Sequence, residues 1–181
     1  MLLDFQAFVT LVDAIGGVDV EVPCAISDPT YPDGGTGYAP FYLPAGEHHL
    51  DGTTALKYVR TRATAGGDFD RTARQRQVVL AVRERVTRLN LLPDLIAQSP
   101  SLWSAVQTAF ETDLTLGEMV DLVVAASRIS SERIVTASID HTCTHPWVTP
   151  EGAEVLLPDR GRIEALVTEL FATPPSTAAS R

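Results

Sequence analysis

The arginines of one short stretch of this chain have the chemistry to bind a phosphate group. Residues 57–88 hold nine of the 14 basic residues against three acidic ones, although the whole 181-residue chain carries a net charge of −9. All but one of the 14 bases are arginine, whose guanidinium grips phosphate or carboxylate through a planar two-pronged fork. The composition therefore favours an anion-binding site in this stretch. A solvated helix face in an arginine-rich protein is the alternative, and composition leaves it open.

The periodicity of residues 70–90 predicts a long helix whose first polar residues lie on the core side. Counting about 100° per residue from Arg71 keeps Gln75 and the apolar residues that follow it within roughly 60° of one line. Free N–H groups at the helix start favour a bound anion, and a buried guanidinium needs a partner. An ion pair of Arg71 with Asp68 or Asp70 would satisfy the same geometry. The two interpretations stand equal at this point.

The residues before this helix are expected to bring two further arginines to its start. Residues 50–56 predict a short helix capped by Asp51, which runs into an extended piece over 58–62. Arg60 and Arg62 lie two apart on that piece, so their side chains would point the same way. We expect them to converge on the start of the long helix.

The remaining segments predict an α/β protein with a mixed sheet flanked by helices. Apolar residues at helical spacing over 5–15 end at Gly16 and Gly17, which is typical of a helix C-terminus. The other expected elements are a strand 18–22, an irregular loop 27–40, an extended piece 41–43 with a turn at 44–46, helices 101–110, 115–129 and 158–171, and a strand 134–139. Apolar residues make up 45% of the chain and charged ones 20%, as in globular proteins. No uncharged apolar run reaches the 18 or so residues that span a membrane.

Two multi-residue blocks around the arginines form a specific pattern. Residues 50–62 read L-D-G-x-x-A-L-x-Y-x-R-x-R, and residues 68–75 read D-F-x-R-x-x-R-Q. Upstream, residues 16–20 read G-G-V-x-V. With these blocks the chain resembles the LytR-CpsA-Psr family over most of residues 4–171, and the stretch 146–159 is also similar to some members.

The resemblance implies an extracytoplasmic enzyme of Gram-positive-type cell envelopes with an α/β/α domain. Such enzymes transfer a phosphoglycopolymer (teichoic acid, capsule or arabinogalactan) from a polyprenyl-diphosphate carrier to peptidoglycan. By this resemblance Arg60, Arg71 and Gln75 contact the lipid diphosphate, and Arg62 and Arg74 belong to the same binding motif.

The resemblance also places Asp68 in the site and gives it and Arg71 the catalytic roles. Convergent arginines would stabilise the charge that develops on the leaving phosphate. Asp68 would orient the arginines or accept the proton of the attacking hydroxyl. Capping of the helix start is an equally good interpretation of Asp68.

The chain departs from the family pattern at its start. Family members carry an upstream half with an Asp-Arg motif and the acidic ligands of Mg²⁺, preceded by a membrane helix. We therefore expect residues 1–171 to form the C-terminal part of such a domain, with its upstream half missing and 172–181 as a flexible tail. The Mg²⁺ ligands and the membrane anchor are expected in the missing half, and no metal ligand is assigned in this chain.

Two other functions remain as alternatives. The chain could bind a lipid diphosphate or glycan without catalysis. It could also regulate transcription, a label the family has carried historically. The acidic net charge, the lack of a clear helix-turn-helix and the inward arginines disfavour that reading, so no nucleic-acid partner is expected.

A few other polar residues have ligand chemistry. His141, Cys143 and His145 alternate, as zinc ligands on an extended segment would, but no fourth ligand is evident and polar loop residues are favoured. Cys24 and Cys143 would pair only in an oxidising compartment, and sequence does not decide it.

Two further polar pairs are expected in turns. The acids at positions 28 and 33 belong either to a cation-binding loop or to a solvated turn, and the turn is favoured. His48 and His49 are expected to be exposed in the turn beside Gly46.

Overall fold

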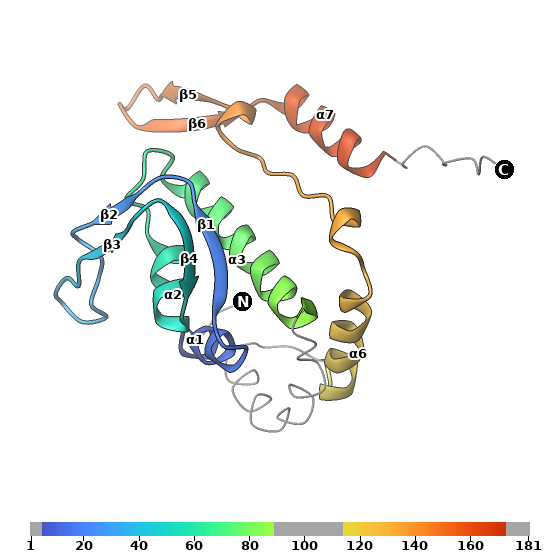
Figure 1. The fold of residues 1–181 in the computed structure, drawn as a ribbon. Coiled ribbons are helices and arrows are strands. Elements are labelled where there is room, and N and C mark those ends of the chain that lie inside the picture. The colour runs from blue at the N-terminus through green and yellow to red at the C-terminus, as the bar shows by residue number, and fades with distance from the viewer. Residues whose placement is uncertain (1–4, 89–113, 173–181) are drawn as a thin grey trace. The chain divides into compact units, whose positions relative to one another are not determined.

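The computed structural model describes residues 5–88 and 114–172. These residues belong to two compact units, Met1–Ser131 and Glu132–Arg181, and each is described by itself. Figure 1 shows the elements of both. The predicted helix 101–110 and nearly all of the predicted tail 172–181 lie outside the described residues.

The first unit opens with helix α1 (Phe5–Ala14), which ends as predicted. Gly16 and Gly17 follow it with φ values of 74° and 86°, a conformation that glycine adopts without strain. The Gly17 N–H donates to the Val12 carbonyl at 2.9 Å and closes the last turn. The Gly-Gly turn thereby ends the helix and leads directly into a strand.

A long, bent antiparallel ribbon follows. Its strands are β1 (Val18–Val22), β2 (Ile26–Asp28), β3 (Phe41–Leu43) and β4 (Gly46–Leu50). β1 pairs with β4 from Val18↔Leu50 to Val22↔Gly46, and β2 pairs with β3 from Ile26↔Leu43 to Asp28↔Phe41.

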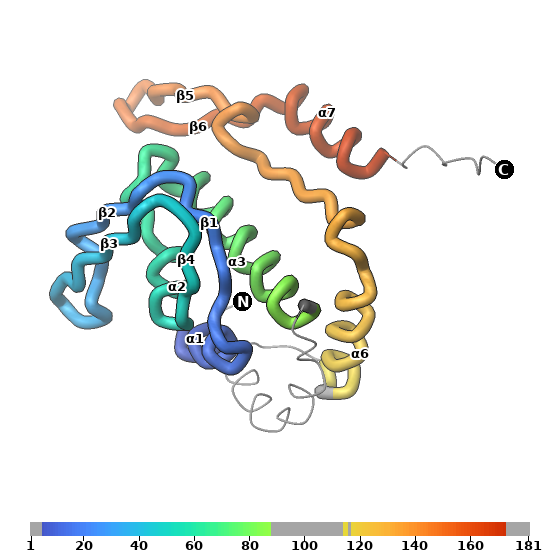
Figure 2. Tube along the Cα trace, viewed as in Figure 1, coloured from blue at the N-terminus to red at the C-terminus, as the bar shows by residue number. Residues whose placement is uncertain are grey.

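The two halves of the ribbon are out of step by one residue. Residues 23–25 lie opposite 44–45 alone, so the first strand carries one extra residue there, as in a β-bulge. Figure 2 shows the ribbon bending at this point. The strand β4 was not predicted: its sequence GEHHL is largely polar, and its pairing with β1 rather than its own propensity makes it a strand.

Two helices pack on the ribbon and position the arginines. Helix α2 (Gly52–Arg60) is capped by Asp51, whose carboxylate accepts from the Thr54 N–H at 2.7 Å. It continues through Tyr58 and Val59, which are buried. The expected extended piece over 58–62 is therefore wrong for its first half: apolar residues at positions 55, 58 and 59 keep helical spacing, and their burial extends the helix to Arg60.

Helix α3 (Asp68–Arg88) confirms the predicted long helix and its inward stripe. Val78 is fully buried, and Val82 and Val86 pack against the core. The core joins α1, the ribbon, α2 and α3, and its buried residues are Val12, Ile15, Val18, Val20, Val22, Ile26, Tyr31, Phe41, Leu43, Leu50, Ala55, Tyr58, Val59 and Val78.

Helix α6 (Leu116–Ser127) begins at the predicted capping box. Thr115 accepts from the Glu118 N–H, and Glu118 Oε2 in turn accepts from the Thr115 N–H at 2.8 Å. Beyond this helix a single 3₁₀ turn, η1 (Ser131–Arg133), follows. Arg83 on α3 donates to the Ile129 carbonyl and to Ser131 Oγ, which ties the end of this segment to α3.

The second unit is a hairpin with one helix. A 3₁₀ turn η2 (His141–Cys143) leads into β5 (Thr144–Val148), which pairs with β6 (Glu154–Pro158), and α7 (Arg160–Phe171) follows. The predicted helix 158–171 is confirmed with a later start, because Asp159 caps it by accepting from the Arg162 N–H. The predicted strand 134–139 is wrong. That segment has no regular structure and no partner strand among the described residues.

The α/β class is confirmed, and the sheets differ from the single mixed sheet that was expected. The described strands form three two-stranded antiparallel ladders. In the ribbon the β2–β3 pair is nested in sequence between β1 and β4, and β5 and β6 form a hairpin, so every ladder is antiparallel. Within the described ranges, no helix is both long enough and apolar enough to cross a membrane.

Candidate anion-binding site

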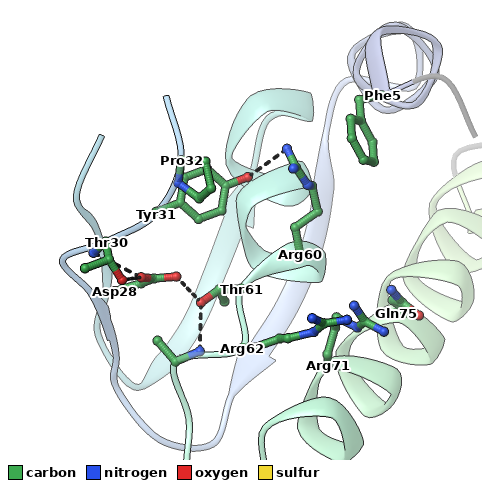
Figure 3. A pocket seen from close by; sticks show the side chains of 11 residues that line it. Phe5, Asp28, Thr30, Tyr31, Pro32, Arg60, Thr61, Arg62, Arg71 and Gln75 are labelled. Atoms are coloured by element: carbon green, nitrogen blue, oxygen red, sulfur yellow. Dashed lines mark hydrogen bonds between the residues drawn. The ribbon is translucent and has the colours of Figure 1, made fainter. Parts of the chain in front are cut away.

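A cavity of about 650 Å³ opens where α2 ends, α3 begins and the tip of the ribbon folds over both. Figure 3 shows its side chains. They come from three segments that are distant in the sequence: the start of α1, the ribbon after β2, and the α2–α3 region. The lining residues are Phe5, Asp28, Thr30, Tyr31, Pro32, Arg60, Thr61, Arg62, Ala63, Arg71 and Gln75.

Arg60 enters the cavity as the last residue of α2. Its guanidinium lies over the ring of Phe5, 4.0 Å from the ring centroid, and 5.8 Å from that of Tyr31. Its Nη1 donates to the Tyr31 hydroxyl at 3.5 Å. Burial raises the pKa of Tyr31, and the positive charge of Arg60 offsets part of that rise. Two aromatic faces thus hold one cation at the rim of the cavity.

Asp68 links the other two arginines. Its Oδ1 accepts from Arg62 Nε at 2.9 Å and from Arg71 Nη2 at 2.8 Å. Arg62 side-chain exposure is 63%, whereas that of Arg71 is 26%. The ion pair that sequence offered as an alternative to an anion site is therefore present, and the arginines also line the cavity.

One donor on Arg71 has no acceptor. Its Nε is the only buried side-chain nitrogen or oxygen among the described residues that lacks a hydrogen-bond partner. A buried N–H without an acceptor costs about 1–3 kcal/mol. Arg71 lines the cavity, but its Nε itself is closed to solvent.

Gln75 adds a neutral amide to the wall one helical turn along α3. Its Nε2 donates to the Val59 carbonyl at 3.3 Å, near the end of α2. Of the predicted site residues, the structure brings Arg60, Arg62, Arg71 and Gln75 to one cavity. Asp68 stands beside that cavity and orients two of them.

The structure does not bring Arg74 to the cavity lining. Arg74 is 6% exposed. Its Nε donates to the Tyr58 carbonyl at 2.9 Å, its Nη2 to the Thr61 carbonyl, and its Nη1 to Thr64 Oγ1 at 3.3 Å. Burial lowers the pKa of the Arg74 guanidinium. These hydrogen bonds fasten the end of α2 and the α2–α3 loop.

Sequence reasoning missed the wall that faces the arginines. Asp28 is 8% exposed; its Oδ2 accepts from Thr61 Oγ1 at 2.6 Å and its Oδ1 from the Thr30 N–H at 3.2 Å. It was expected in a solvated turn or a cation-binding loop, yet it ends strand β2 facing inward. The solvated-turn reading fits Asp33, whose carboxylate accepts from the N–H groups of Gly35 and Gly37. The only sequence signal for Asp28 was the alternation in Ile26–Asp28.

The described residues contain no group of three or more His, Cys, Asp or Glu side chains that could hold a metal ion. The expected alternation at positions 141–145 is broken, because His141–Cys143 form a 3₁₀ turn with Cys143 buried. Cys24 and Cys143 are free thiols. His49 lies in strand β4, not in a turn, and its Nδ1 is 2.6 Å from Asp19 Oδ1.

A known family matches nearly the whole chain. The sequence model of the LytR_cpsA_psr family matches residues 1–172. The chain belongs to the LytR-CpsA-Psr family.

Relatives of this family confirm the fold. The chain is 29% identical over 163 residues to the polyisoprenyl-teichoic acid–peptidoglycan teichoic acid transferase TagV of Bacillus subtilis, covering 90% of this chain and 39% of TagV. The TagU transferase of Halalkalibacterium halodurans is 35% identical over 122 residues, 66% of this chain and 36% of TagU. The crystal structure of B. subtilis TagV matches with a TM-score of 0.63 at 26% identity, over 93% of this chain and 60% of that one.

A solved LytR-CpsA-Psr structure supports the same architecture. A LytR-Csp2A-Psr enzyme from Actinomyces oris matches with a TM-score of 0.61 at 22% identity over 91% of this chain and 61% of that chain. The chain thus spans well under half the length of the curated transferases that it matches.

Proposed function

We propose that this chain is the diphosphate-binding part of a phosphotransferase that moves a phosphoglycopolymer from a polyprenyl-diphosphate carrier to peptidoglycan. The polymer would be of teichoic acid, capsule or arabinogalactan type. One observation carries the proposal: Arg60, Arg62 and Arg71, from two separate stretches of the chain, line one cavity. The printed names of TagV and TagU, which are teichoic acid transferases, support the choice of substrate class.

The three arginines would hold the diphosphate and stabilise the charge that grows on the leaving phosphate. Phosphoryl transfer asks a protein mainly for positioning and electrostatic stabilisation. Fixed donors in a partly enclosed cavity supply this stabilisation without reorganising during the reaction. Arg71, whose side chain is less exposed than that of Arg62, would contribute more than Arg62, because screening by water is weaker there.

Asp68 would act as a positioning residue in this reaction. Both Arg62 and Arg71 already donate to its Oδ1, so this oxygen is engaged before substrate arrives. That geometry favours orientation of the arginines over acceptance of the proton from the attacking hydroxyl. The loop before α3 is instead fastened by Asp70, whose Oδ2 accepts from the Gly66 N–H at 2.9 Å.

A bound Mg²⁺ remains a proposal, and no ligand for it is assigned among the described residues. Asp28 is the one acid in the cavity lining, and both of its oxygens accept hydrogen bonds from threonines. Asp68 is engaged by two arginines. A cation site would need ligands other than these residues. No step is therefore assigned to the metal.

The acceptor and the place of action follow from the same proposal. Peptidoglycan as the acceptor implies work on the extracytoplasmic face of the cell membrane, with the membrane reached through an upstream anchor. The names of the relatives, which are teichoic acid transferases and a probable cell wall biosynthesis protein of Corynebacterium glutamicum, support this coarse assignment.

Binding of farnesyl diphosphate to the 181-residue chain tests the proposal. Isothermal titration at several salt concentrations should give a measurable affinity that falls with salt, since ion pairs are screened. Arg60→Ala and Arg71→Ala should each weaken binding about tenfold or more, as expected for loss of a charge-assisted contact. Arg76→Ala is the matched control, because Arg76 lies on α3 outside the cavity lining. Unchanged affinity and salt dependence in both cavity variants would overturn the site.

Binding without transfer is the second candidate. It is favoured by the carboxylates at the cavity, because Asp28 and Asp68 already accept hydrogen bonds from other side chains. A single-turnover assay with a polyprenyl-diphosphate glycan and a peptidoglycan fragment decides between the two. Product formation establishes the transferase, whereas tight binding with no product establishes the binder.

A further inference from the structure

Thr61, the residue between Arg60 and Arg62, is held at both of its polar ends by buried side chains. Its Oγ1 donates to Asp28 Oδ2 at 2.6 Å, and its carbonyl accepts from Arg74. The exposures of Thr61 and Asp28 are 2% and 8%. A single residue is therefore clamped between the ribbon and α3.

The clamp acts where α2 ends. Thr61 is the C-cap residue of α2, with φ −58° and ψ 142°, so the chain turns from helical to extended at this position. Its N–H still donates to the Lys57 carbonyl at 3.0 Å. Its hydroxyl also accepts from the Ala63 N–H at 3.2 Å, which fixes the chain on the far side of Arg62. The backbone that carries both arginines is thus defined by the hydrogen bonds of one hydroxyl and one carbonyl.

The proposed function assigns no chemical role to Asp28. A carboxylate in the wall of an anion site opposes anion binding by Coulomb repulsion. Here its oxygens accept from Thr61 and Thr30, and it lies opposite Arg71 and Gln75 in Figure 3. Its contribution to an anion site must therefore come from what it holds rather than from what it binds.

We propose that Asp28 is a positioning residue that acts through Thr61 to fix the directions of Arg60 and Arg62 at the cavity. The expected effect on diphosphate affinity rests on the proposed function, whereas the expected effect on the order of the two arginines does not. Without the Asp28–Thr61 hydrogen bond, the C-cap of α2 would sample several conformations. The two arginines would then have to be ordered by the ligand, at a cost in binding.

Three variants test the clamp. Thr61→Val keeps the shape and removes the hydroxyl, Asp28→Asn removes the charge, and Thr61→Ser restores the hydroxyl as a conservative rescue. Thr53→Val is the matched control, an exposed threonine on the same helix. Circular dichroism checks folding of each, and Asp28→Asn carries the test if Thr61→Val does not fold.

Two readouts separate positioning from general stability. NMR relaxation of the Arg62 Nε–H, assigned with Arg62→Lys, should report increased disorder in Thr61→Val and Asp28→Asn. Hydrogen exchange at the Ala63 amide should speed up in Thr61→Val. Thr61→Ser and Thr53→Val should match the wild type in both. Folded Thr61→Val and Asp28→Asn variants with unchanged Arg62 order would overturn the proposal.

Titration with inorganic pyrophosphate and farnesyl diphosphate joins the inference to the site. Affinity for both should fall about tenfold to a hundredfold in Thr61→Val, the range expected for mispositioned groups, and recover in Thr61→Ser. If wild type binds neither probe while Thr61→Val still loses arginine order, the proposed function fails and the positioning role of Asp28 stands. Binding that Thr61→Val leaves unchanged despite lost order would refute the positioning role.

Discussion

The guanidinium of Arg60 lies over the ring of Phe5, with 4.0 Å between its central carbon and the ring centroid. Phe5 begins α1 and Arg60 ends α2, so this contact joins two helix ends that are more than fifty residues apart in sequence. A cation over an aromatic face is stabilised by about 0.5–2 kcal/mol, depending on desolvation. The contact with Phe5 helps to fix the guanidinium of Arg60 and uses none of its hydrogen-bond donors.

Replacement of Phe5 should therefore change the affinity for a diphosphate without changing the charge of the site. Phe5→Leu removes the ring face and is expected to weaken farnesyl diphosphate binding severalfold, while the salt dependence stays that of the wild type. Arg60→Ala should lower both. Titration at three salt concentrations measures each effect, and a Phe5→Leu chain whose salt dependence falls as in Arg60→Ala would contradict the stacking role.

Arg74 is expected to stabilise the fold rather than to bind ligand. Its guanidinium donates to two carbonyls and one hydroxyl in a buried position. Arg74→Ala leaves those acceptors unsatisfied and should lower the free energy of unfolding by about 2–4 kcal/mol. Arg128→Ala, an exposed arginine on the first unit, should change it little. Urea unfolding measures both, and equal midpoints for the two variants would argue against the clamp.

The stabilisation of α2 by its capping residue Asp51 should depend on pH. The backbone N–H of Thr54 holds the pKa of Asp51 below its ordinary value of 3.8. A carboxylate with a lowered folded-state pKa adds stability above its unfolded pKa and loses it as pH falls through the folded value. At pH 7 Asp51→Ala should lose about 1 kcal/mol of unfolding free energy.

The acid limb of the stability curve checks this assignment. Wild type and Asp51→Ala should converge as the pH falls below the folded-state pKa of Asp51, since the wild-type carboxyl is then protonated. Asp51→Ser keeps a capping oxygen without a titrating group. It should retain most of the stability both at pH 7 and below the folded-state pKa of Asp51. A gap between wild type and Asp51→Ala that is constant with pH would rule out the carboxylate as its source.

Gly52, the first residue of α2, lies against the backbone of α1. A Cβ at Gly52 would lie 2.3 Å from the carbonyl oxygen of Val9, and the Gly52 N–H donates to Asp13 Oδ1 at 2.7 Å. Gly52→Ala should therefore push the helices apart and cost about 1–3 kcal/mol, as overpacking does. Gly117→Ala on α6, where a Cβ meets only one atom at 4.0 Å, is expected to be neutral or stabilising. Thermal unfolding of the pair tests this, and a Gly52→Ala chain as stable as the wild type would disprove the tight contact.

The long helix α3 and its cationic beginning were predictable because both depend on local periodicity. Arg71, Gln75 and Val78 share a face whatever else the chain does. The spacing of Arg60 and Arg62 misled the local prediction, because burial of Tyr58 and Val59 against the core extends α2 beyond where its polar sequence suggests. Tertiary packing decided that boundary.

The facing wall of the cavity could not be predicted from local pattern. Asp28 and Thr61 are 33 positions apart, and only the pairing of β2 with β3 brings the acid over α2. The hairpin of β5 and β6 was missed for a related reason. Its strands THPWV and EVLLP contain prolines and no strict alternation, so their pairing rather than their propensity defines them.

The extra residue at 23–25 has a consequence for how this ribbon tolerates change in length. Side chains alternate along a strand, so removing one residue there would exchange the roles of neighbours and present Ser27 where Asp28 now reaches Thr61. Removing two would restore the parity. Among proteins that keep an acid at the position of Asp28, the length of this bend should therefore vary in steps of two residues, even where its sequence varies.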